Sequence, residues 1–184
     1  AIESGEITVL VDEEVAKEAL VSKVPIKGVA DLAGVKIRSP EGLAAEVFKR
    51  AGATPVSLPF SEVYTSLEKG IVDAADASAL VNNDASGMQK VAKYPVYPGI
   101  HSMAVLQFIV NKDLWDSLTD GERTALEVWY AAAYDSMRRD ADLLDREIAA
   151  GYSAGGDITV IDWPQEERDK FREIAVGAWH DFAE

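Results

Sequence analysis

The sequence predicts an α/β protein with a mainly parallel sheet, helices on both faces and a long helix in its C-terminal half. Residues 31–76 alternate between short β-type and helical patterns, giving strand, helix, strand, helix and strand in turn. Two consecutive β-α-β units require right-handed crossovers, which place the connecting helices over a parallel sheet. Further along, apolar residues recur every three or four positions from Thr119 to Ile148, as in a long helix.

The elements of the first half follow from turn residues that bound apolar runs. Gly52 ends the first helix, Pro59 ends the second strand and Gly70 ends the second helix. The expected order is strand Val35–Arg38, a helix with Leu43, Val47 and Phe48 on one face, strand Thr54–Leu58, a helix from Ser61, and a strand from Ile71.

The second half is predicted to contain one more central strand and two helices. Residues 103–111, MAVLQFIVN, form the most hydrophobic run and are expected to be a buried central strand. Thr119 and Glu122 have the spacing of a capping box, which would begin the long helix. The remaining expectations are a short helix at 82–92, a crossing loop at 93–102, a helical turn at 113–117, a strand at 158–163 and a last helix from Pro164 to about Phe182.

Composition excludes several classes of function. The net charge of −14 argues against binding to nucleic acid, whose phosphates require a basic face. The chain has no cysteine, which rules out disulfides and thiol chemistry. No apolar run approaches the roughly 18 residues that span a bilayer, and no signal peptide is visible at the N-terminus, where it would have been removed or lie upstream.

The stretch KIRSPEGLAAEVFKRAGATPVSLPFSEVYTSLEKGIVDAADA resembles the extracytoplasmic solute-binding proteins of TRAP transporters, the DctP-type family. The segment NKDLWDSLTDGERTAL resembles the family's entry into its long helix, and the likeness extends from Lys23 to the C-terminus. YPVYPGIHSMAVLQFIVN is most similar to the branch that binds 2-oxo or 2-hydroxy acids. The resemblance implies a periplasmic-binding-protein-like lobe, a periplasmic location, a membrane permease as partner and no catalytic step.

The resemblance also suggests that part of such a receptor is missing. These receptors bind their ligand between two lobes. Only about thirty residues precede the KIRSP strand, which is too few for most of the N-terminal lobe. We therefore expect a fragment: residues 1–30 as a remnant of an N-terminal lobe, 31–118 as a ligand-binding lobe, and 119–184 as elements that complete it and brace the hinge. A naturally shortened relative is the alternative.

Arg38 is the strongest candidate for ligand binding. An arginine at the carboxyl end of a parallel strand presents a planar donor fork where open α/β sheets bind ligands. The family's carboxylate-binding arginine matches this position. The alternative is a surface arginine paired with Glu41 or Asp31, which would contribute little.

Other polar and aromatic side chains are expected around the same site. Asp76 follows the third strand, Asn82 lies shortly after it, and His101 precedes the apolar run at 103–111. The candidate substrate-binding set is Arg38, Asn82, Asp76, Phe60, Tyr64 and His101. Asn82 could equally cap a helix with Asn83, and His101 could be exposed in a turn.

The resemblance also raises the question of a metal site. In the oxo-acid branch a glutamate and a tryptophan at the positions of Asp76 and Ala77 help to bind a metal ion that bridges protein and solute. Asp76 and Gln107 are therefore candidate ligands for Na⁺ or Ca²⁺, although no metal is required and no oxygen-rich loop is visible. Two functional alternatives stay open: an enzyme acting on a small oxo acid through Asp76 and His101, and a dimerisation domain built on helix 119–148, which would make a homodimer.

Overall fold

A computed structural model describes residues 7–14, 18–101 and 105–183, with only the backbone described at 7–14 and 105–107. The chain divides into two compact units, one formed by residues 1–16 and 102–143 and the other by residues 17–101 and 144–184. Each unit is considered separately below. The predicted assignment of segments to lobes stays a prediction.

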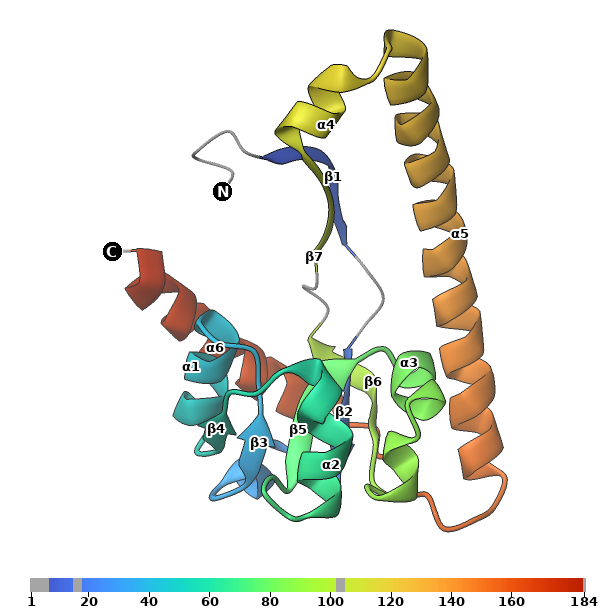
Figure 1. Ribbon diagram of the computed structural model, residues 1–184. Coiled ribbons are helices and arrows are strands. Elements are labelled where there is room, and N and C mark those ends of the chain that lie inside the picture. Colours follow the sequence, from blue (N-terminus) through green and yellow to red (C-terminus); the bar gives the residue numbers. More distant parts are fainter. Residues whose placement is uncertain (1–6, 15–17, 102–104, 184) are drawn as a thin grey trace. The chain divides into compact units, whose positions relative to one another are not determined.

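The larger unit is built on a five-stranded mixed sheet (Figure 1). Its strands lie in the order β4, β3, β5, β2, β6, where β3 is parallel to β4 and β5, and β2 is antiparallel to β5 and β6. The strands are β2 (Glu18–Ser22), β3 (Lys36–Arg38), β4 (Thr54–Val56), β5 (Ala74–Ser78) and β6 (Val96–His101). The α/β fold class is confirmed, and the crossovers β3-α1-β4 and β4-α2-β5 are the predicted pair.

Helices cover both faces of this sheet, as predicted. Leu20 and Ala74 pack on one face with residues of α1 (Leu43–Arg50) and α6 (Gln165–Ala183), whereas Val21 and Ala75 pack on the other with residues of α2 (Val63–Glu68). Alternate residues of β2 and β5 thus enter two separate cores, as strand geometry requires. The remaining elements are α3 (Leu80–Ala85) and the 3₁₀ turns η1 (Val29–Leu32), η2 (Phe60–Glu62) and η3 (Met88–Lys90).

The smaller unit contains a two-stranded antiparallel ribbon of β1 (Ile7–Glu14) and β7 (Val105–Asn111), followed by α4 (Lys112–Ser117). The expectation that residues 103–111 form a buried central strand is wrong, because β7 pairs only with β1 within the described residues and Ile109 is 52% exposed. Hydrophobic composition alone does not distinguish a central strand from a ribbon whose other face is uncovered.

The long helix α5 (Asp120–Ser153) begins in the smaller unit, and its last turns belong to the larger one. Its predicted capping box is confirmed: Glu122 Oε2 accepts hydrogen bonds from the backbone N–H and the hydroxyl of Thr119, and the N–H of Glu122 donates to Thr119 Oγ1. These bonds satisfy backbone groups that an uncapped helix would leave unpaired. No helix in the described part of the chain is long and apolar enough to span a membrane.

Three expectations for the irregular segments are wrong. Residues 96–101 form strand β6 instead of a loop, because their backbone pairs with β2 despite two prolines nearby. Residues 158–163 form no strand, and only Ile161 bridges to Val96. The helix expected at 82–92 is divided into α3 and η3 by Gly87, whose φ of 72° no helix accommodates.

Candidate functional site

Four polar residues lie at one edge of the five-stranded sheet. Arg38 ends β3, Asp76 is the middle residue of the five-residue strand β5, and His101 ends β6. Glu18 begins β2, which runs antiparallel to β5 and β6, so the start of β2 meets the ends of its neighbours. The four therefore come from four successive strands, at the edge where open α/β sheets bind their ligands.

The Arg38 guanidinium is oriented by two backbone carbonyls. Its Nε donates to Leu58 O at 3.1 Å and its Nη1 donates to Asp76 O at 2.6 Å. Nη2 has no hydrogen-bond partner among the described residues, although Arg38 is only 9% exposed. A guanidinium fixed on two sides with an unused nitrogen is prepared for an anionic partner.

The surface ion pair considered as an alternative for Arg38 is not formed. Glu41 accepts a hydrogen bond from the Ser57 hydroxyl, and Asp31 accepts one from the Lys27 backbone N–H. Among the residues that the structure describes, Arg38 makes no ion pair. Its contacts are to carbonyl oxygens, so the positive charge has not been neutralised by a protein carboxylate in contact with it.

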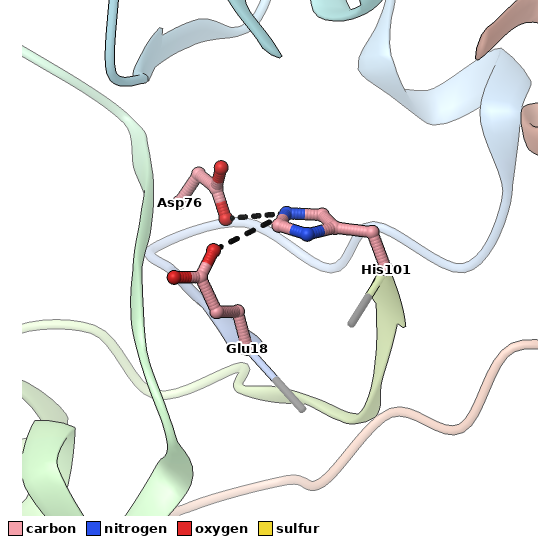
Figure 2. A group of neighbouring side chains, drawn as sticks. All are labelled: Glu18, Asp76 and His101. Atoms are coloured by element: carbon pink, nitrogen blue, oxygen red, sulfur yellow. Dashed lines mark hydrogen bonds and ion pairs between the residues drawn. The ribbon is translucent and has the colours of Figure 1, made fainter. Parts of the chain in front are cut away.

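Glu18, Asp76 and His101 form a compact cluster (Figure 2), and Arg38 is linked to it through the backbone carbonyl of Asp76. His101 Nε2 lies 2.9 Å from Asp76 Oδ1 and 3.5 Å from Glu18 Oε2. The Asp76 side chain is 1% exposed, whereas those of Glu18 and His101 are 21% and 26% exposed. One imidazole nitrogen thus faces two carboxyl groups, and Asp76 Oδ2 is buried without a hydrogen-bond partner.

The backbone around this cluster is held by residues outside it. A Cβ atom at Gly99 would overlap the carbonyl oxygen of Glu18, so glycine permits the close approach of β6 to β2. Arg168 of α6 donates to the carbonyl oxygens of Gly99 at 2.6 Å and Pro98 at 2.9 Å. These contacts fix the strand end that carries His101.

Two members of this cluster, Glu18 and His101, have raised pKa values. Burial, together with the charge and hydrogen bond of Asp76, raises the pKa of Glu18 to about 7 against the opposing charges of His101 and Arg38. For His101, burial alone would lower the pKa. The hydrogen bond to Asp76 and the charges of Asp76 and Glu18 outweigh burial, so the pKa of His101 is raised.

The other predicted site residues follow strands β4 and β5 along the chain, and no hydrogen bond joins their described side chains to the cluster. Asn82 is exposed on α3 and donates to Ser78 Oγ at 2.9 Å. It does not cap α3, because both Asn82 and Asn83 lie inside the helix and the first residue before it is Ala79. Phe60 follows β4 and is 41% exposed, while Tyr64 on α2 is half-buried. Their roles in binding stay predictions.

The described donors do not suit the predicted Na⁺ or Ca²⁺. Both ions prefer oxygen ligands, and Ca²⁺ takes six to eight of them. Here Asp76 Oδ1 is paired with a histidine nitrogen. The remaining carboxyl group, Glu18, has a pKa raised to about 7, so its charged form is disfavoured. The three groups lie close enough to share an ion, and Asp76 Oδ2 is unpaired, but the donor set is not that of a hard cation. The Gln107 side chain lies outside the described part of the chain.

Residues 3–184 match the model of a protein family described as bacterial extracellular solute-binding protein, family 7. The chain belongs to this family. Family 7 members are solute-binding proteins, which excludes the enzyme alternative.

Individual relatives agree with this assignment. The chain is 29% identical over 162 residues to the monocarboxylate 2-oxoacid-binding periplasmic protein of Nostoc sp., covering 88% of this chain and 44% of that protein. It is 45% identical to an apo, open TRAP periplasmic solute-binding protein from Rhodobacter sphaeroides, with a TM-score of 0.74, covering 98% of this chain and 57% of that one. The periplasmic ectoine-binding protein of Halomonas elongata, at 24% identity and a TM-score of 0.86, shares the fold, with 98% and 58% covered.

These coverages show that the chain spans about half the length of the family 7 relatives that it matches.

Sequence reasoning missed Glu18 as a member of the site. It lies 58 residues before Asp76 and 83 residues before His101, and no motif connects the three. Antiparallel pairing of β2 between β5 and β6 brings them together, with Glu18 opposite His101 in the register. The only local signal is one acidic residue directly before the apolar run Ala19–Val21.

Proposed function

We propose that this chain contributes a lobe to a periplasmic receptor that captures a small organic carboxylate through Arg38 and delivers it to a membrane TRAP permease. The observation that carries the proposal is the Nη2 of Arg38, which has no described partner on a guanidinium otherwise held by two carbonyl groups. A carboxylate accepts two parallel N–H donors from such a fork. The arrangement therefore favours a carboxylate over a neutral solute.

The solute class is proposed to be a 2-oxo or 2-hydroxy acid. The printed function of the Nostoc relative, monocarboxylate 2-oxoacid binding, supports this class. The Halomonas relative is an ectoine-binding protein, so family membership alone does not select the solute. At this sheet edge, the Glu18, Asp76 and His101 cluster beside Arg38 offers both donors and acceptors to a polar group next to the carboxylate.

Capture by such a receptor involves no chemical step. Closure of a second lobe over the solute would exclude water and strengthen the contact between Arg38 and the carboxylate. No nucleic acid is expected as a partner, because the chain carries a net charge of −14. A homodimer through α5 is kept as a second hypothesis, since Val128 and Trp129 of this helix are 64% and 58% exposed.

A binding screen with an arginine variant tests the proposal. The protein, expressed from its complete coding sequence, is titrated calorimetrically with pyruvate, 2-oxobutyrate, lactate, succinate and ectoine. Arg38→Lys keeps the charge but removes the fork, so it should weaken binding of the preferred acid roughly 10- to 100-fold, as expected for a charge-assisted bond. The matched control is Arg50→Lys, because Arg50 pairs with Glu46 on the surface of α1. Equal affinity in wild type and Arg38→Lys would refute the role of Arg38.

A further inference from the structure

The two nitrogens of the His101 ring have different surroundings. Nε2 lies 2.9 Å from Asp76 Oδ1, so the Nε2–H donates to that oxygen when Asp76 is ionised. Nδ1 bonds to none of the residues that the structure describes. In a neutral ring whose proton is on Nε2, Nδ1 is an acceptor, which repels a carboxylate. In the protonated ring Nδ1 becomes a donor, which attracts one.

The His101 ring lies at Asp76, a predicted ligand of the metal ion. Asp76 Oδ1 is already hydrogen-bonded to the imidazole (Figure 2). A protonated imidazole supplies one unit of positive charge, as Na⁺ would, on the same aspartate whose backbone carbonyl accepts from Arg38. It also offers a directed N–H donor, which a metal ion lacks.

We propose that protonated His101, held by Asp76 and Glu18, provides the second positive charge for a carboxylate bound at Arg38 and takes the place of a bridging metal ion. This inference rests on the proposed function of Arg38 as a carboxylate anchor. It adds that capture of the anion requires a proton on His101 and is accompanied by proton uptake. Binding would then depend on pH and not on Na⁺ or Ca²⁺.

Glu18 is the group that would take up the proton. The charged groups that face it are Asp76 from β5, His101 from β6 and Arg38 from β3. Only His101 and Arg38 favour its ionised form, and an anion bound at Arg38 cancels the contribution of Arg38. The pKa of Glu18, already about 7, should therefore rise further when the anion binds. Affinity should be greatest below this pKa and should fall as the pH rises through it.

A measurement without solute tests the charge on His101. In NMR titrations of the complete protein, the His101→Gln and His180→Gln variants assign the signals of His101 and of His180, which is exposed on α6. In metal-free buffer we expect the pKa of His101 to lie above its ordinary value and to fall in Glu18→Gln, which removes a neighbouring negative charge. Glu68→Gln, an exposed carboxylate on α2, is the matched control and should leave it unchanged.

Two results of that titration would overturn the inference. One is a His101 pKa at or below the ordinary value of a histidine and insensitive to Glu18→Gln. The other is a saturable shift of the His101 signals on addition of CaCl₂ or NaCl at constant ionic strength, because it would show that a cation displaces the imidazole from Asp76.

A second measurement separates this inference from the proposed function. Pyruvate is titrated near pH 7 in buffers of different ionisation enthalpy, with and without EDTA, and we expect uptake of up to about one proton per pyruvate in both conditions. His101→Gln should reduce both affinity and proton uptake, whereas His180→Gln should change neither. Binding that depends on Arg38 but needs Ca²⁺ and takes up no proton would overturn the inference and leave the proposed function intact. Absence of pyruvate binding at every pH would count against the proposed solute class, and the His101 titration would still decide the charge on the ring.

Discussion

Substitution of Glu18 by glutamine should make the protein more stable at high pH than at low pH, relative to wild type. The pKa of Glu18 is raised from 4.5 to about 7, so the folded state holds a proton that the unfolded state releases. Stability from this proton is fully present below about pH 4.5 and is lost as the pH rises to 7 and beyond. Glutamine carries no charge at any pH and does not suffer this loss.

The size of the effect follows from the shift. A change from 4.5 to about 7 corresponds to an upper limit of about 3 kcal/mol at 1.36 kcal/mol per pKa unit. The Glu18 side chain is 21% exposed, so solvent screening should reduce this to about 1–2 kcal/mol. The contribution of His101 to the stability of the protein also falls as the pH rises, because its raised pKa favours a proton in the folded state. Because Glu18→Gln also removes a charge that raises the His101 pKa, the comparison with wild type reports the coupled pair, and both contributions have the same sign.

Urea unfolding at about pH 5 and about pH 8 measures this difference. We expect the free energy of unfolding of Glu18→Gln, minus that of wild type, to be about 1–2 kcal/mol larger at the higher pH. Glu68→Gln should give the same difference at both values. If Glu18→Gln also gives one constant difference, Glu18 titrates normally and the electrostatic account of the cluster is wrong.

Two further predictions concern the backbone that supports the cluster. Gly99→Ala places a methyl group against the carbonyl oxygen of Glu18, so β6 should separate from β2. The protein should then lose about 2 kcal/mol or more of stability in thermal unfolding. The pKa of His101 should also return toward its ordinary value, because the ring moves away from Glu18 and Asp76. A variant as stable as wild type would contradict the packing at this point. Arg168→Ala removes the bonds to Pro98 and Gly99 and should cost about 2–4 kcal/mol, whereas Arg172→Ala, which loses only a surface pair, should cost less than about 0.5 kcal/mol. Equal losses in these two arginine variants would show that Arg168 does not hold the strand.

Features encoded over short distances were predictable from the sequence. The capping box at Thr119, the ends of the first two helices and the position of Arg38 at a strand end each depend on residues within a few positions of one another. The surface ion pairs considered as the alternative for Arg38 are absent among the described residues for a related reason. Glu41 and Asp31 are near in sequence, but the carbonyl oxygens of Leu58 and Asp76 are the groups that the parallel strands bring to it.

Features that depend on pairing between distant segments were not predictable. β6 has the composition of a loop, and only its pairing with β2 and the contacts of Arg168 make it a strand. Glu18 was overlooked because its neighbours in space are set by the antiparallel insertion of β2 into an otherwise parallel arrangement. His101 was a candidate, but its protonation depends on Glu18 and Asp76 together. A single sequence shows residue types and spacing, and neither determines this register.

The central claim is that Arg38 binds a carboxylate, and a crystal structure of the complete protein with its tightest-binding acid would test it most directly. We predict a solute carboxylate oxygen about 2.7–2.9 Å from Arg38 Nη2, with the bonds from Nε to Leu58 and from Nη1 to Asp76 retained. A bound acid whose carboxylate contacts other residues, with Arg38 bonded only to protein carbonyl groups, would contradict the account.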